Sequence, residues 1–590
     1  MILQTLDWII IACYFALSLF IGFWYRKQAG KSLTDFFLGG RNMPWYVAGI
    51  SMVATTFAAD TPLWVTEVIA QHGISGNWLW WNMLIGGMLT TFFFAKLWRR
   101  ADILTELEFI ELRYGGAPAR FLRGFKSVYM GLFLNVIIIG WVNFALMTIL
   151  SVFFDIPFYD NTIPFYENQV LWYVGGAMLI TAFYSLLSGL KGVAMTDTIQ
   201  FIIAMGGCII MAILVLNAPE VGGITGLKEK LPAWRFDFFP NLDTGGGIVE
   251  KIGTYSITVG AFLTFGMVQW WASWYPGAEP GGGGYVAQRM MSTRSEKESL
   301  WATLFFQIAH YCLRPWPWII VGLCALVLYP DLQPEQAGQG FVLVMRDYLP
   351  TGIKGLLLVA FLSAYMSTIS TQLNWGASFL TNDLYKRFIK PEEKFESEEK
   401  AQDNYVKAAR AFTVLIMVVA FFVTTQISTI DAAAKFLIQA GAGLGMVLIL
   451  RWYWWRINAW SEISASLAPM LGYAFANYYL HLDFPGNFLI TVAFTTVVWL
   501  VVTFATKPES TATLEVFYKR VRPPGWWGVF KNSTVTQSVS GLVVSWLAAI
   551  VMTYSILFFM GYLIFGNTML CVLWLAVAVV SLFVLAKSMK

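Results

Sequence analysis

Residues 49–67 decide the fold, and they read GISMVATTFAADTPLWVTE. The stretch is apolar enough for a membrane helix, yet it contains Asp60 and, two positions later, Pro62. Proline has no N–H and its ring clashes with the carbonyl four residues earlier, so the helix is expected to break here. The break frees carbonyls near residues 54–58, and free carbonyls at membrane depth are tolerated only where they face a cavity or bind something. The stretch therefore predicts a broken membrane helix with a site at its break. The alternative is a plain proline kink in which Asp60 bonds to a neighbouring helix.

The composition of the whole chain places this helix in a polytopic membrane protein. Of 590 residues, 57% are apolar and 13% charged, and mean hydropathy is +0.61. Soluble chains carry about 25% charged residues, so a soluble globule, a disordered tail and a nucleic-acid binder are excluded. Apolar runs of the length that a membrane helix needs, about 20 residues, recur from end to end. The five cysteines lie in apolar segments without metal-ligand spacing, which indicates small buried apolar residues.

The apolar runs predict fifteen membrane helices. They lie at about 7–25, 44–70, 78–97, 127–155, 170–189, 191–217, 252–275, 300–329, 353–383, 409–428, 433–455, 458–480, 486–506, 537–565 and 568–587. With the N-terminus outside, 31 of the 39 Lys and Arg residues fall in inside segments and 7 in outside ones. Because basic residues concentrate in cytoplasmic loops, this imbalance predicts an external N-terminus and an internal C-terminus.

The ninth predicted helix carries a face of hydroxyl groups. Ala364, Ser367, Thr368 and Thr371 recur at the spacing of one helical face, and Ser370 and Asn374 widen it. Hydroxyl oxygens are hard ligands, and together with freed carbonyls they form an oxygen cage of little formal charge, which suits a monovalent cation. The alternative is that these are small packing residues with hydroxyls bonded to their own helix.

Three further segments carry expectations. Asp197 lies near the start of the sixth helix with no Lys or Arg nearby in the span, so a cation or hydrogen bonds must offset its burial; the alternative is a helix cap. The run 281–284 is expected to be a flexible internal loop. The segment 104–114 reads as a short amphipathic helix at the membrane surface.

Several motifs together resemble the sodium:solute symporter family, which includes sodium/sugar, sodium/proline and sodium/sialic acid symporters. They are SLTDFFLGGR (32–41), TDTIQ (196–200), YVAQRMMSTRSEKE (285–298), AYMSTISTQLN (364–374) and TNDLYK (381–386). The likeness covers roughly residues 7–506. It implies an all-α membrane protein of the leucine-transporter type, with five-plus-five inverted repeats whose first helices are interrupted.

The resemblance also implies a division of the chain. The expected parts are a leading helix and internal loop (1–43), a first five-helix repeat (44–217), an external loop (218–251), a second repeat (252–456) and four additional helices (457–590).

Site residues follow from the resemblance and from the break. The main sodium site is implied to use the carbonyls of Ala54, Phe57 and Ala364 and the hydroxyls of Ser367 and Thr368. A second sodium site is implied at Asp197, Ser370 and Thr371, with Ser367. We expect the substrate pocket at Asp60, Thr61, Glu67, Gln269 and Trp270.

The expected function is sodium-coupled secondary active symport by alternating access, with one or two sodium ions and a small polar organic solute. A sugar or polyol is favoured, because Trp64, Trp270 and Trp271 suit the apolar face of a sugar ring. His310 and Arg314 favour an anionic substrate instead, so a carboxylate or amino acid stays open, as does a sodium-linked channel or sensor. An enzyme is disfavoured, since the three histidines form no H-E-x-x-H motif and no nucleophile–base pair is evident. The expected location is the inner (plasma) membrane, as a multi-pass protein in the lipid bilayer, without nucleic acid and without an obligate protein partner.

Overall fold

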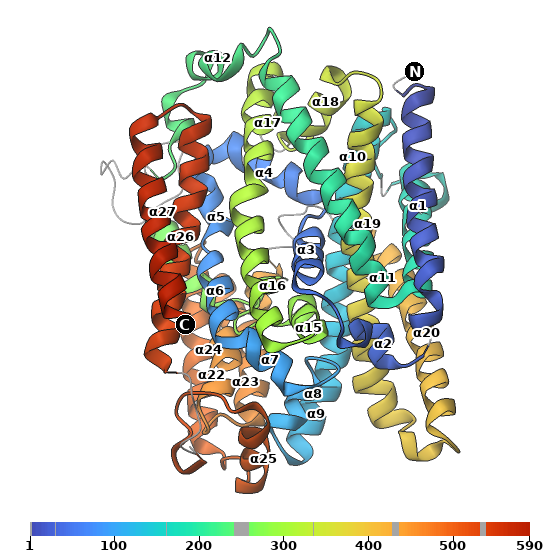
Figure 1. Ribbon diagram of the computed structural model, residues 1–590, viewed down its shortest axis with the longest axis vertical. Coiled ribbons are helices and arrows are strands. Elements are labelled where there is room, and N and C mark those ends of the chain that lie inside the picture. Colours follow the sequence, from blue (N-terminus) through green and yellow to red (C-terminus); the bar gives the residue numbers. More distant parts are fainter. Residues whose placement is uncertain are drawn as a thin grey trace.

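The computed structural model describes residues 3–29, 31–160, 162–240, 259–275, 277–333, 336–427, 436–530 and 538–589. These residues form a bundle of long helices that run side by side along the vertical axis of Figure 1, with the N-terminus at the top. Within them, nine helices are long and apolar enough to cross a membrane. Other predicted spans are divided into shorter helices, and the predicted segments 252–258 and 433–435 lie outside the described residues.

Helices follow one another along the whole described chain. The first half contains α1 (Thr5–Ala29), α2 (Leu33–Leu38), α3 (Trp45–Thr56), α4 (Asp60–His72), α5 (Trp78–Trp81), α6 (Leu84–Leu89), α7 (Ala95–Ala101), α8 (Glu108–Arg113), α9 (Gly116–Val128), α10 (Asn135–Phe154), α11 (Gln169–Leu216) and α12 (Gly223–Lys230). The second half contains α13 (Val259–Thr264), α14 (Trp270–Ala272), α15 (Gly284–Ser292), α16 (Glu296–Ile308), α17 (Pro315–Leu328), α18 (Gln339–Tyr348), α19 (Ile353–Ser378), α20 (Glu398–Thr424), α22 (Leu444–Tyr453), α23 (Ala459–Ala474), α24 (Gly486–Ala505), α25 (Thr511–Val521), α26 (Val539–Ile564) and α27 (Thr568–Ser588). Wider π-helical turns join several of these pieces, among them Phe265–Gln269 between α13 and α14 and Ala309–Leu313 between α16 and α17.

The predicted break in the second span is present. Helix α3 ends at Thr56 and α4 begins at Asp60, with residues 57–59 between them. Pro62 lies in the first turn of α4, where its missing N–H leaves no helical bond unmade. The chain resumes its helix because the Ala58 carbonyl accepts the N–H of Thr61 at 3.2 Å. The span is therefore two half-helices that meet inside the protein.

A second break lies where the sequence suggested a flexible loop; the chain is a loop here, but its glycines are packed inside the protein. The segment 273–283 separates α14 from α15, and its glycine run is buried. Gly281 accepts a hydrogen bond from the Trp98 indole at 3.0 Å, and the N–H of Gly284 donates to Glu106 at 2.6 Å. A side chain at Gly282 would meet Thr90, Met290 and Trp98 within about 3 Å, so glycine here permits close packing rather than flexibility.

The segment 104–114 also differs from its prediction, because it packs inside the protein instead of lying on the membrane surface. Arg113 of α8 is fully buried and donates to the carbonyls of Arg451, Trp454 and Ile457 at 2.7, 3.0 and 3.0 Å. The apolar face of α8 therefore packs on protein, and its arginine satisfies the carbonyls that the end of α22 leaves free.

The last two helices, α26 and α27, pair with each other along one side of the bundle (Figure 1). Helix α26 is bonded to α5 and α6: Trp546 donates to the carbonyl of Ile85 at 2.9 Å, and Tyr554 donates to that of Trp81 at 2.8 Å.

Candidate ion and substrate site

The hydroxyl face of α19 contacts the broken end of α3. The Thr368 hydroxyl donates to the Thr55 carbonyl at 2.9 Å and to the carbonyl of Ala364 at 3.2 Å. The hydroxyls of Thr55 and Thr371 lie 3.0 Å apart. All five residues implied for the main sodium site are buried in α3, α19 or the break: Ala54, Phe57, Ala364, Ser367 and Thr368. Neutral oxygens of two helices thus gather at one place, the chemistry that a sodium ion needs.

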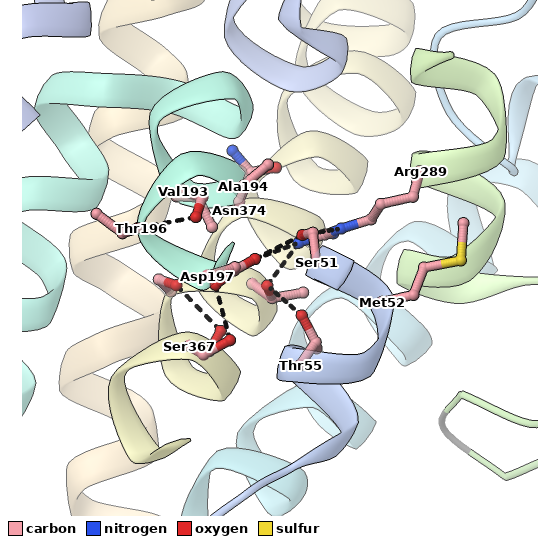
Figure 2. A network of polar contacts seen from close by, with 12 residues as sticks. Ser51, Met52, Thr55, Val193, Ala194, Thr196, Asp197, Arg289, Ser367 and Asn374 are labelled. Atoms are coloured by element: carbon pink, nitrogen blue, oxygen red, sulfur yellow. Dashed lines mark hydrogen bonds and ion pairs between the residues drawn. The ribbon is translucent and has the colours of Figure 1, made fainter. Parts of the chain in front are cut away.

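Asp197 lies in a buried network that joins four helices (Figure 2). Its carboxylate, fully excluded from solvent, accepts the Ser51 hydroxyl of α3 at 2.5 Å and the Ser367 hydroxyl of α19 at 2.7 Å. Arg289 of α15 lies 3.8 Å from the same carboxylate and also donates to Thr371 at 2.7 Å and to Ser51 at 3.2 Å. The sequence called for a cation or hydrogen bonds to offset the burial of Asp197. The structure supplies two hydroxyl donors and, from α15, the guanidinium of Arg289.

The residues implied for the second sodium site make contacts that differ from those of a common cation site. Asp197 is no helix cap, since α11 continues on both sides of it. Ser370 donates to the Ser367 carbonyl of its own helix at 3.0 Å and makes no bond to Asp197. Thr371 accepts from Arg289. Ser367, which the resemblance gives to both sites, is the one hydroxyl of α19 in this implied set that donates to Asp197, at 2.7 Å. A guanidinium thus lies where the sequence suggested a second cation.

A cavity of about 170 Å³ lies between the two breaks. Its walls include residues of α3, α4, α5, α10, α15 and α19, of the segment that follows α14, and of the π-helical turn between α16 and α17. The lining residues are Thr55, Thr56, Ala58, Asp60, Thr61, Trp64, Leu79, Trp80, Met83, Ile138, Trp141, Val142, Tyr275, Gly277, Ala278, Tyr285, His310, Tyr311, Arg314, Thr368, Gln372 and Ile438. Of the predicted substrate residues, Asp60 and Thr61 belong to this lining, whereas Glu67, Gln269 and Trp270 do not.

Both basic residues singled out in the eighth span face this cavity. Arg314 is 1% exposed, donates to the Thr56 hydroxyl at 2.9 Å and lies over the Trp318 ring at 5.1 Å. A ring nitrogen of His310 lies 3.0 Å from the same hydroxyl. The π-helical turn Ala309–Leu313 and the residue after it bring both side chains to the cavity wall. The sequence did not point to Tyr275 or Tyr285, since both lie in or next to the second break.

Residues 36–468 match the sodium:solute symporter family, which is more than half of the chain. The protein belongs to this family. Its relatives include the sodium/glucose cotransporter of Vibrio parahaemolyticus, 23% identical over 84% of this chain and 90% of that one. The sodium/sialic acid symporter SiaT of Proteus mirabilis is 25% identical over 81% of this chain and 91% of that protein. Sodium/proline symporter 2 of Staphylococcus saprophyticus is 23% identical over 79% and 84%. These relatives are transporters, and they differ in the solute they carry.

Among solved structures, the chain resembles a sodium-coupled sialic acid symporter in a substrate-bound outward-open state. The TM-score is 0.67 with 21% identity, over 86% of this chain and 99% of the other. At this identity the likeness concerns the fold. It confirms the expected helical fold of leucine-transporter-type membrane transporters.

Proposed function

We propose that the protein imports a small polar organic solute across the plasma membrane by sodium-coupled alternating access. The single observation that carries the proposal is the contact between Thr368 of α19 and the Thr55 carbonyl at the end of α3. Both residues also line the cavity. An ion held at this contact would therefore act directly on the shape of the solute cavity, which is what coupling requires.

The proposed main sodium site takes the carbonyls of Ala54, Phe57 and Ala364 and the hydroxyls of Ser367 and Thr368. We propose one sodium ion per cycle, because the positive charge of Arg289 already lies beside Asp197. One charge moved down 100 mV supplies about 2.3 kcal/mol, and at about 1.4 kcal/mol per tenfold this equals about fifty-fold accumulation of solute.

In the proposed mechanism the two repeats, 44–217 and 252–456, each contribute one broken helix to the solute cavity. Sodium enters from outside and ties the end of α3 to α19, which shapes the cavity for the solute. The loaded protein then opens inward, and sodium leaves into the low-sodium cytoplasm. The two broken helices are the parts that move, because their ends meet at the cavity and the network of Asp197 crosses between them.

Uptake into proteoliposomes tests the proposal. Purified protein is reconstituted, and solute accumulation is followed under an inward sodium gradient, with potassium replacing sodium in the control. Symport requires accumulation above the external concentration that collapses when the gradient is removed. Sodium-dependent flux that only runs down the solute gradient would indicate a channel, and solute binding without flux would indicate a sensor.

The cavity gives limited support to a sugar or polyol as the solute. Trp64 lines it, but Trp270 does not. Two charged side chains, Asp60 and Arg314, line it as well, and an uncharged sugar could offer them hydrogen bonds but no opposite charge.

A further inference from the structure

The solute cavity contains one buried guanidinium and one carboxylate that do not pair with each other. Arg314 and Asp60 both line it. Neither Arg314 nor Asp60, however, forms an ion pair with any of the described residues. Opposite charges that face one cavity without neutralising each other leave room for a ligand between them.

The guanidinium of Arg314 has an N–H group without a hydrogen-bond partner. One of its terminal nitrogens donates to Thr56 at 2.9 Å and approaches the Val53 carbonyl at 3.4 Å. Its Nε has no hydrogen-bond partner, although the side chain is only 1% exposed. A buried guanidinium without a carboxylate is costly, and a bidentate carboxylate is the partner that its planar fork fits best. The cavity is the open side on which such a partner fits.

The carboxylate of Asp60 has an oxygen without a hydrogen-bond partner. Asp60 is the first residue of α4, and its Oδ1 is buried with no hydrogen-bond partner. This buried oxygen is therefore left for a donor that enters from the cavity, which Asp60 lines. An ammonium group offers donors and charge together, whereas a sugar hydroxyl offers a donor without charge.

Aromatic rings form much of the remaining wall. Trp141 and Tyr275 stack at 6.4 Å between ring centroids, and Trp80 stacks with Tyr311 at 5.8 Å. Such faces hold an apolar body and attract a cationic nitrogen as well. The wall therefore suits a compact solute with an apolar part and charges at its ends.

We propose that the transported solute is a zwitterion of the amino-acid type, with its carboxylate at Arg314 and its ammonium group at Asp60. The proposal rests on the proposed function and narrows its solute class. A neutral sugar would leave both charges without partners. A simple carboxylate would satisfy Arg314 but place a second negative charge near Asp60.

The test removes one charged group of the cavity at a time and compares the binding of solutes that carry both charges, one charge or none. Thermal stabilisation of the purified full-length protein is measured in sodium with the common amino acids, with the matching amines and carboxylic acids, and with neutral sugars. The variants are Asp60→Asn and Arg314→Gln, with Arg314→Lys as the control that keeps the charge. Stabilisation by sodium alone shows that each variant is folded.

Wild-type protein should bind amino acids at least about a hundredfold more tightly than the matching amines or acids, because each analogue leaves one buried charge unpaired. Asp60→Asn should reverse the preference toward the deaminated acid, and Arg314→Gln toward the decarboxylated amine. Arg314→Lys should retain the preference for the zwitterion.

Two results overturn the inference while leaving symport intact: sodium-driven uptake of a neutral sugar with no response to zwitterions, or equal losses for every solute in both variants. Failure of every zwitterion to stabilise the wild type also overturns it. Tight zwitterion binding that is the same in sodium and potassium, with no driven uptake, would instead refute the proposed function and keep the solute class.

Discussion

Replacing Arg289 by methionine should turn the network of Asp197 into a sodium site. The guanidinium is 3.8 Å from the Asp197 carboxylate and forms its only ion pair among the described residues. Removing one partner of a buried ion pair costs about 3–5 kcal/mol, because the remaining charge is left uncompensated. Methionine keeps much of the length of arginine, so lost packing should add little. In potassium, Arg289→Met should therefore be strongly destabilised.

Sodium should restore much of that loss. The groups left behind are the carboxylate of Asp197 and the hydroxyls of Ser51, Ser367 and Thr371, all hard oxygen donors. A cation that binds only the folded state stabilises it by about 2.7 kcal/mol at a hundred times its dissociation constant. Most of the destabilisation should thus be recovered at high sodium, and potassium should not substitute.

The assay is unfolding in detergent across sodium concentrations, with potassium chloride holding the ionic strength constant. The limiting slope of unfolding free energy against the logarithm of sodium concentration counts bound ions. We expect one ion for the wild type and two for Arg289→Met. The double variant Arg289→Met with Asp197→Asn should return to one, because no charge is left to attract the second ion. An unchanged slope in Arg289→Met, or a slope of two in the wild type, would refute the reasoning.

Three further predictions concern coupling, orientation and stability. Thr368→Ala removes the hydroxyl that contacts the end of α3 and should weaken sodium affinity by about tenfold to a hundredfold, read from the sodium dependence of uptake, whereas Thr368→Ser should keep most of it. A peptide tag at the N-terminus of the chain should be cleaved by external protease in intact cells while a tag at the C-terminus is protected, and accessibility of both from one side would contradict the odd number of predicted spans. Arg113→Met should lower the free energy of unfolding by about 1–3 kcal/mol, since it leaves buried carbonyls unpaired, whereas the exposed Arg120→Met should change it by less than about 0.5 kcal/mol.

The first break was predictable from the sequence, and the second was not. Pro62 and Asp60 stand inside an otherwise apolar run, so a helix with a defect is the simplest interpretation. The residues 276–284 contain prolines and four consecutive glycines, and the same composition is typical of a surface loop. A buried break and a surface loop can therefore be told apart only by their packing. The burial of Gly282 between Trp98 and Met290 depends on contacts with distant parts of the chain.

The candidate site was predictable to the extent that it follows helical spacing. The spacing of Ser367, Thr368 and Thr371 places their hydroxyls on one face, and α19 shows that face against α3. The partner of Asp197 does not follow from spacing, since Arg289 is 92 positions away and reaches it only because α15 lies beyond the second break.

The network around Asp197 also has a kinetic consequence. It crosses α3, α11, α15 and α19, so none of these helices can separate from the others without breaking several bonds to buried charged groups at once. Because these bonds lie in a medium of low dielectric, water cannot exchange for them one at a time. The passage between the two orientations should then be a single activated step with a steep temperature dependence, and the turnover rate should be set there rather than by solute binding.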